Sequence, residues 1–504
     1  MKQILGKCVG LFSAGVVGLG LFLPVAWASP ELKLGALFQD HAVFQQGKPV
    51  PVWGWAVPGQ KVEVEYRGNK AGVLTGTSGR WQVFLPAMKG SAEPAELVVR
   101  AEKSIVLHDV VVGEVWLCSG QSNMEWHVRD VIHAEQEIAE ADFPLIRHFR
   151  TSLVVSETPL ADCAGAWTPA SPSTVPAFSA VAYFFARDLH RNLKVPIGLI
   201  NTSWGGKMIE VFMSEEALAG SPASEAVSKR WKEQQERFPA VLAAHEKQQA
   251  TSSGKRTDPR ELFAQNRPSS LFNGMISPVI PYAIRGAIWY QGEHNIGRAS
   301  EYNGLFTAMI ADWRQKFQQG DFPFYFVQLA NFEAPLDKSR EGYAKLREAQ
   351  LQTLSVPNSG MAVTIDIGTP ENVHPKNKQE VGARLARWAQ AKTYNLGGVW
   401  SGPLFKSAIR EASSLRLTFD HAEGGLVAPH EPITSFEVAG ASGKFYPATA
   451  KIDGRTLVVQ ASEVKEPVSV RYAWANAPVA SLFNKEGLPA SPFRTDNSPV
   501  SGGH

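Results

Sequence analysis

Residues 113–124 read GEVWLCSGQSNM, an apolar run that ends in small and polar residues. The run is typical of a buried β-strand, and helix-compatible residues follow it. A strand-to-helix turn of this kind exposes one hydroxyl, here that of Ser122, beside backbone N–H groups that have no partner. The stretch therefore predicts a nucleophile at the edge of a sheet.

Length and charge limit the possible functions. With 504 residues and 44% hydrophobic content, the chain can bury more than one core, and about two to four domains are expected. A formal net charge of +2 does not indicate nucleic-acid binding. Small neutral or mildly anionic substrates are expected instead. No group of cysteines and histidines has zinc spacing, and we predict no metal and no cofactor.

Residues 1–28 have the pattern of a signal peptide. Lys2 and Lys7 form a positive start, residues 8–23 are apolar, and Ala26–Ala28 is a small-x-small cleavage pattern. We therefore predict a secreted or periplasmic protein with cleavage near Ala28. An uncleaved anchor is the alternative, because the apolar run is nearly long enough to span a bilayer. No later segment has a transmembrane pattern.

Cysteine use leaves two possibilities open. Cys118 and Cys163 are the thiols that remain after the leader. In an oxidising compartment the two could pair as a disulfide. Alternatively, Cys118 is a buried, unpaired residue beside the strand.

The rest of the chain divides into three blocks. Residues 29–110 show short alternating strands with Gly and Pro turns, which predict a small β-sandwich. Residues 111–400 alternate apolar runs with helical segments, which predicts a parallel sheet with helices on both faces and ligands at the carboxyl ends of its strands. Within them, residues 214–265 are expected to form an inserted helical hairpin or lid, or else a solvated surface excursion. Residues 401–504 return to β-type alternation and predict a C-terminal β-rich domain.

A serine needs a base to become a nucleophile, and the best candidate is His374. It lies in residues 371–378, ENVHPKNK, where Pro375 fits the first turn of a helix. His374 would then lie on a loop at a helix start, free to face Ser122. The alternative is that the His-Pro pair is an ordinary surface loop.

Hydrolysis also needs proton donors aimed at the developing oxyanion. Residues 201–206, NTSWGG, follow an apolar strand, and paired glycines permit the close approach of a backbone N–H. Residues 289–295, WYQGEHN, follow another strand and offer the side-chain amides of Gln291 and Asn295. Each segment alone could be ordinary turn chemistry. Their occurrence at successive strand ends favours a shared site.

The motifs at residues 120–124, 204–206, 289–295 and 374–378 resemble the conserved blocks of sialate O-acetylesterases, within the SGNH-hydrolase superfamily. This resemblance covers nearly the whole chain after the leader. Together with the patterns above it implies an α/β fold, an SGNH or flavodoxin-like parallel sheet with helices on both faces. N- and C-terminal β-sandwich-type domains would flank this sheet.

The resemblance also implies an esterase that removes acetyl groups from sugar hydroxyls. Ser122 would attack the acetyl carbonyl, and His374 would act first as base and then as acid. The backbone N–H groups of Ser122 and Gly206 would hold the oxyanion, together with the side-chain amide of Gln291, which we favour slightly, or of Asn295. Glu293 is expected to be a buried structural residue rather than a general base.

Two departures from the family pattern affect these expectations. The aspartate that usually lies three residues before the catalytic histidine is Glu371 here. Glu371, Asp366 or a backbone carbonyl would then orient His374. Lys207 and Phe212 stand where relatives tend to carry threonine and tryptophan, so substrate contacts are expected to differ.

The substrate is expected to be an O-acetylated sugar, most simply an O-acetylated sialic acid. The resemblance and the sequence leave two alternatives open: acetylxylan or another acetylated polysaccharide, and, in a different class, a non-catalytic glycan-binding protein. Three tryptophans near the motifs are candidates to stack on sugar faces, although tryptophan is as often a core residue. Two arginines are candidates for a sialate carboxylate by proximity in sequence. These residues are Trp126, Trp204, Trp289, Arg129 and Arg298.

Overall fold

The computed structural model describes residues 31–249 and 257–496. The predicted signal peptide therefore lies outside the described residues. Within them, no helix is long and apolar enough to cross a membrane. Cys118 and Cys163 are both free thiols, and Cys118 is buried, as in the second of the two possibilities above.

The N-terminal strands form two layers. Strands β1, β3 and β6 make a three-stranded antiparallel sheet, while β4, β5 and β7 join β8, along which β2 also pairs. Strand β4 alternates exposed or half-buried positions with buried ones because successive side chains point to opposite faces. The strands are β1 (Lys33–Leu34), β2 (Val43–Gln45), β3 (Val50–Trp55), β4 (Lys61–Tyr66), β5 (Asn69–Leu74), β6 (Arg80–Leu85), β7 (Ser91–Arg100) and β8 (Ser104–Gly120).

Strand β8 continues into the central sheet, where the strand order is β10-β9-β11-β8-β12-β13-β14. Strands β9, β11, β8, β12, β13 and β14 run parallel, and only β10 is antiparallel to its neighbour. The boundary expected near residue 110 falls inside β8, which belongs to both regions. The further strands are β9 (Phe143–Thr151), β10 (Gly165–Ala170), β11 (Ile197–Asn201), β12 (Gly286–Tyr290), β13 (Phe324–Val327) and β14 (Ser359–Ala362).

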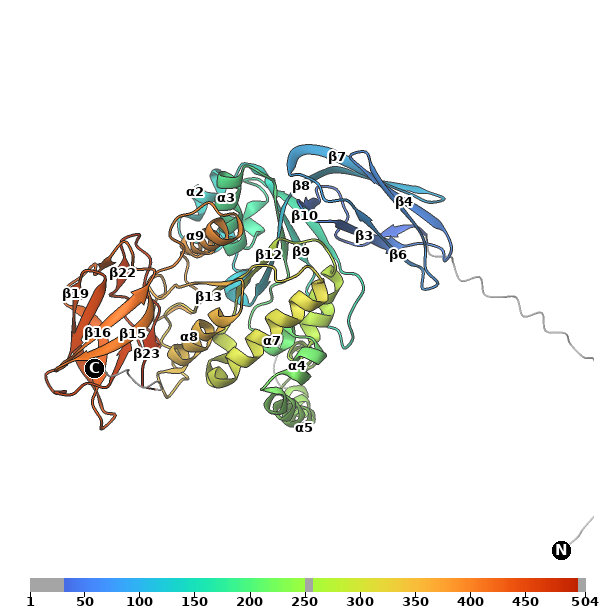
Figure 1. The fold of residues 1–504 in the computed structure, drawn as a ribbon. Coiled ribbons are helices and arrows are strands. Elements are labelled where there is room, and N and C mark those ends of the chain that lie inside the picture. Colours follow the sequence, from blue (N-terminus) through green and yellow to red (C-terminus); the bar gives the residue numbers. More distant parts are fainter. Residues whose placement is uncertain (1–30, 250–256, 497–504) are drawn as a thin grey trace, which may run out of the picture.

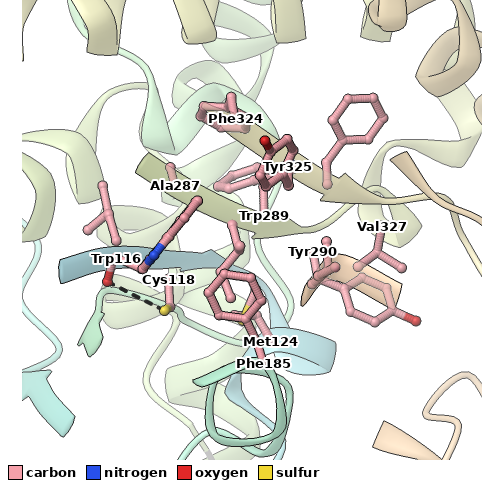
Figure 2. Close-up of a cluster of buried hydrophobic side chains, with 14 of the residues drawn as sticks. Trp116, Cys118, Met124, Phe185, Ala287, Trp289, Tyr290, Phe324, Tyr325 and Val327 are labelled. Carbon is pink, nitrogen blue, oxygen red and sulfur yellow. Dashed lines mark hydrogen bonds between the residues drawn. The ribbon is translucent and has the colours of Figure 1, made fainter. Parts of the chain in front are cut away.

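Helices cover both faces of the central sheet (Figure 1). Helices α3 (Ala180–Leu193) and α9 (Lys378–Trp388) pack together on one face, and α7 (Ala299–Phe317) and α8 (Gly342–Gln352) on the other. On the first face, Trp116 from β8 lies 5.0 Å from Phe185 of α3 and 5.8 Å from Tyr325 of β13, between ring centroids (Figure 2). Fully buried strands of this kind read as continuous apolar runs.

Residues 214–265 form three helices, joined by short turns, where the structure describes them. The aromatic rings of α5 and α6 pack together, with Phe263 stacked on Trp231 at 4.6 Å and on Phe238 at 4.1 Å. The helices are α4 (Glu215–Gly220), α5 (Ser224–Gln249) and α6 (Pro259–Gln265).

The C-terminal region lies at the opposite end of the molecule from the N-terminal strands (Figure 1). It forms a seven-stranded antiparallel sheet in the order β15-β16-β20-β19-β18-β21-β23 and a separate β17-β22 pair. The buried guanidinium of Arg347 in α8 donates to the carbonyls of Ala475 and Asn476 and so joins this region to the central one. The strands are β15 (Leu404–Glu411), β16 (Ser414–Asp420), β17 (Leu426–Val427), β18 (Ile433–Ala439), β19 (Phe445–Asp453), β20 (Thr456–Gln460), β21 (Ser469–Tyr472), β22 (Phe483–Asn484) and β23 (Phe493–Arg494).

Candidate active site

The order of the strands reverses at β8. Strand β8 comes before β11 and β12 in the chain, and these two strands lie on its opposite sides. Where the winding reverses in this way, the loops at the carboxyl ends diverge and leave room for a ligand. Helix α1 (Ser122–Glu125) begins just after β8, so Ser122 lies at this edge.

A glycine fixes the turn that presents Ser122. Gly120 has a φ of 138°, and a β carbon at this position would collide with the carbonyl oxygen of Tyr290. The backbone N–H of Gln121 donates to the same carbonyl at 3.0 Å. Only glycine permits this close approach, and it holds the serine turn against β12.

The structure brings Ser122 and His374 together. His374 Nε2 lies 2.8 Å from Ser122 Oγ, although the two residues are 252 positions apart. The loop that carries His374 ends in α9, and the His374 N–H donates to Asn372 Oδ1 at 2.9 Å. Burial, and then the charge of Lys378, lower the pKa of His374. The imidazole is therefore neutral near pH 7 and able to accept a proton.

An indole orients the imidazole. The Trp126 ring is stacked on that of His374, with centroids 4.7 Å apart and planes 24° apart. Its Nε1 donates to the carbonyl of Asp130 at 3.1 Å, which fixes the indole in turn. One face of Trp126 is thus occupied by the imidazole.

Neither predicted carboxylate reaches His374. Glu371 is exposed, and no hydrogen bond or ion pair joins it to His374 in the described part of the chain. Asp366 binds Arg384 with both oxygens, each at 2.6 Å. The expectation that Glu371 orients His374 is therefore wrong in this structure, because the tight loop directs that side chain into solvent. The geometry is that of a Ser-His dyad.

Two backbone donors next to Ser122 remain available. The Gly205 N–H is taken by Glu125 Oε2 at 2.7 Å. The N–H groups of Ser122 and Gly206 make no hydrogen bond to any other group among residues 31–249 and 257–496. A β carbon at Gly205 would lie 3.3 Å from that of Ser122, so the glycine turn lies against the serine. Ser122 and Gly206 therefore stay the predicted oxyanion donors.

The side-chain amides predicted as the third donor are committed elsewhere. Gln291 Nε2 donates to the Lys207 carbonyl at 3.1 Å and to Asn295 Oδ1 at 2.7 Å. Asn295 Nδ2 donates to Glu210 Oε2 at 2.9 Å, and its oxygen accepts from the Ile209 N–H at 3.1 Å. Both side chains are buried. The expectation for Gln291 and Asn295 is therefore wrong; the amides instead fix the segment that follows the glycine turn.

The three tryptophans differ in their accessibility. Trp126 and Trp204 are half-buried at the site, and their contact with sugar stays a prediction. Trp289 is fully buried, within the apolar cluster of Figure 2. Its indole packs edge-on against Phe212 and Trp313, with ring centroids 5.3 and 5.9 Å apart. The expectation that Trp289 stacks on a sugar is wrong because its side chain points into the core.

The two arginines considered for a sialate carboxylate each lie beside an acidic residue. Arg298 pairs with Glu210 at 3.2 Å, and Arg129 lies exposed beside Asp130. The buried ammonium of Lys207 donates to Gln265 Oε1, at the end of α6, at 2.8 Å.

The sequence interpretation assigned no role to three residues near the dyad. The exposed His294 lies beside Gly206: its Cε1 would be 3.9 Å from a β carbon there. Asn123 and Lys378 are buried behind the dyad. The signal for all three was present in the motif blocks themselves, because each lies within one of them.

Within the described residues, no three histidine, cysteine, aspartate or glutamate side chains are grouped to hold a metal ion. A serine on a strand-to-helix turn, with a distant histidine within hydrogen-bond distance, is typical of serine hydrolases, the class that includes many esterases. The family described as carbohydrate esterase, sialic acid-specific acetylesterase matches residues 261–391. The chain belongs to the sialate O-acetylesterase family, and the resemblance seen in its motifs is confirmed.

The similarity extends over nearly the whole chain. The sialate O-acetylesterase of Rattus norvegicus is 30% identical, over 95% of this chain and 97% of its own length. That of Homo sapiens is 29% identical, over 95% and 97%. The crystal structure of a carbohydrate acetylesterase from Xanthomonas citri is 37% identical with a TM-score of 0.82, covering 92% of this chain and 100% of that one. The protein is thus a carboxylic ester hydrolase.

Proposed function

We propose that this protein hydrolyses O-acetyl esters on carbohydrates, with Ser122 as nucleophile and His374 as general base and acid. The 2.8 Å contact between Ser122 Oγ and His374 Nε2 carries the proposal. The family membership supports the substrate class, and the order of the parallel strands supports an SGNH-type fold.

The first half-reaction forms an acetyl-enzyme. His374 Nε2 takes the proton of Ser122 as Oγ bonds to the acetyl carbonyl carbon, and the carbonyl oxygen becomes an oxyanion. The N–H groups of Ser122 and Gly206 donate to that oxygen; such donors contribute about 3–4 kcal/mol each to the transition state. The tetrahedral intermediate then collapses, and the imidazolium gives its proton to the departing sugar oxygen.

In the second half-reaction water takes the place of the sugar hydroxyl. His374 removes a proton from the water as the water oxygen attacks the acetyl carbon. Collapse of the second intermediate breaks the bond to Ser122 Oγ, which regains a proton from the imidazolium. Acetate leaves, and the dyad is restored.

Among carbohydrates, O-acetylated sialic acids are the leading substrates, because the rat and human relatives are named as sialate O-acetylesterases. Acetylated polysaccharides, such as acetylxylan, are the second candidate. One observation favours them: Arg298 is paired with Glu210, and Arg129 lies exposed beside Asp130, so neither arginine is set as a dedicated partner for a sialate carboxylate.

Acetate release from purified protein tests the proposal. We expect hydrolysis of 4-nitrophenyl acetate that Ser122→Ala and His374→Ala each abolish while the melting temperature is kept. Full activity in either variant would remove that residue from the mechanism, and a wild-type protein without activity would favour the glycan-binding alternative. A panel of O-acetylated sialic acids and acetylated xylo-oligosaccharides then ranks the two substrate classes.

We also propose export through cleavage near Ala28. The support is the charged start, the apolar run and the small-x-small pattern of residues 1–28. N-terminal sequencing of protein from a secreting host tests it. A mature chain that still begins at Met1 would favour the uncleaved anchor.

A further inference from the structure

Three motif blocks each carry a polar residue that takes no part in the chemistry above: Asn123, Glu293 and Lys378. Asn123 follows Ser122, Glu293 lies beyond β12, and Lys378 is the first residue of α9. Asn123 is 1% exposed and Lys378 0%. One carboxylate oxygen of Glu293 is buried and has no partner. Burying such charges is costly, so their retention behind the dyad calls for a functional reason.

The side-chain amide of Asn123 connects the two charges. Its Nδ2 donates to Glu293 Oε1 at 2.5 Å, and its Oδ1 accepts a hydrogen bond from Lys378 Nζ. The amide oxygen thus faces the cation, and the amide N–H faces the anion. Within the described residues no direct ion pair joins Lys378 to Glu293, so the amide is the link between them.

Asn123, Glu293 and Lys378, here called the unit, approach His374 in two places. Asn123 Nδ2 also donates to the carbonyl of Val373, the residue before His374, at 2.9 Å. The Lys378 ammonium lies 6.0 Å from the ring of Trp126, whose indole is stacked on the imidazole. The unit is therefore bonded to the backbone next to His374 and lies close to the indole that is stacked on its ring.

The charge of Lys378 acts on His374 directly. Burial, and then Lys378, lower the pKa of His374. Burial lowers the pKa of Lys378 itself to about 7, against the opposing effect of Glu293. Below pH 7 Lys378 therefore carries a positive charge, which disfavours protonation of His374.

Other ionisable groups lie around the unit. Glu371 and Lys376 lie in the His374 loop and are exposed, so solvent screens their charges. Tyr290 of β12 lies 5.1 Å from the ammonium, and burial raises its pKa, which keeps it neutral. Glu293 is the acidic residue of the unit, and burial raises its pKa. Lys378 is the buried cation of the unit.

We propose that Lys378, held opposite Glu293 by Asn123, is a positioning residue that keeps His374 in its basic form and in line with Ser122. In an enzyme whose histidine has no carboxylate partner, this unit takes over the orienting role of the third triad member. The inference rests on the proposed function of Ser122 and His374.

The pH dependence of kcat/KM tests the inference. In the wild type the acidic limb reports the loss of activity as His374 becomes protonated. Lys378→Met removes a positive charge near His374. Its removal stabilises the imidazolium and raises the pKa of His374. We expect the limb to move to higher pH by roughly 0.5–1 unit. Lys378→Arg keeps the charge and should return the limb toward the wild-type position. A merely structural role would lower kcat without moving the limb.

Matched controls make the result decisive. Lys376→Met removes an exposed lysine from the same loop and should leave the limb unmoved. If Lys378→Met melts below the assay temperature, Lys378→Gln, which is neutral and can still donate to Asn123, replaces it. A folded neutral variant with the wild-type limb overturns the inference, as does an equal shift in Lys376→Met. Activity that survives Ser122→Ala would instead refute the proposed function.

Discussion

Replacing Glu371 with alanine tests whether a carboxylate helps to activate His374. In serine hydrolases with a full triad, loss of the acidic member lowers kcat by about 10⁴-fold, which corresponds to about 5.4 kcal/mol. In this structure Glu371 is exposed and makes no contact with the imidazole. Its remaining influence is that of a screened surface charge, worth about 0–1 kcal/mol. We therefore expect kcat to stay within about fivefold of the wild type.

The assay is steady-state hydrolysis of 4-nitrophenyl acetate at saturating substrate, with the melting temperature measured in parallel. Asp366→Asn is the matched control, because it weakens a bidentate pair with Arg384 and should lower stability rather than kcat. A fall in kcat of tenfold or more in a stable Glu371→Ala variant would refute the dyad and restore Glu371 as the orienting acid.

Three further outcomes follow from the structure. Trp126→Ala should lower kcat by roughly 2- to 13-fold, because it removes an aromatic stack worth about 0.5–1.5 kcal/mol. Trp126→Phe should keep most of the rate, and equal loss in both variants would contradict a stacking role. Gly120→Ala should abolish activity and lower the melting temperature, since its β carbon would meet the Tyr290 carbonyl; a soluble variant with normal kcat would show that the turn adapts. Arg347→Met should destabilise the fold by about 3–5 kcal/mol in urea denaturation, since it leaves buried carbonyls unpaired, while kcat of the folded fraction is kept; unchanged denaturation would show that these bonds add nothing.

The sequence was sufficient to predict that Ser122 and His374 meet in the folded chain. The apolar run before Ser122 and the His-Pro pair before a helix are local signals, and both keep their meaning in the folded chain. The family motifs then linked Ser122 to His374 across 252 positions. The alternation of apolar runs and helical segments likewise predicted a parallel sheet, which the structure contains.

The predictions that failed concern residues whose side-chain direction is set only in the folded chain. Trp289 lies in a strand buried on both faces, where period-two alternation no longer marks a solvent side. Gln291 and Asn295 have the right chemistry for an oxyanion donor, but their hydrogen bonds to each other and to the 207–210 segment are made only in three dimensions. Glu371 occupies the family's acidic position, yet a loop can turn its side chain outward without any change in spacing.

The length of β8 has a consequence for the molecule as a whole. Its 17 residues form one strand, interrupted near its middle by Asp109, whose φ is 54°. One end pairs with β7 in the N-terminal region, and the other ends at the serine turn. The N-terminal strands and the central sheet therefore share a strand. A cut near residue 110 would divide the strand that leads to Ser122.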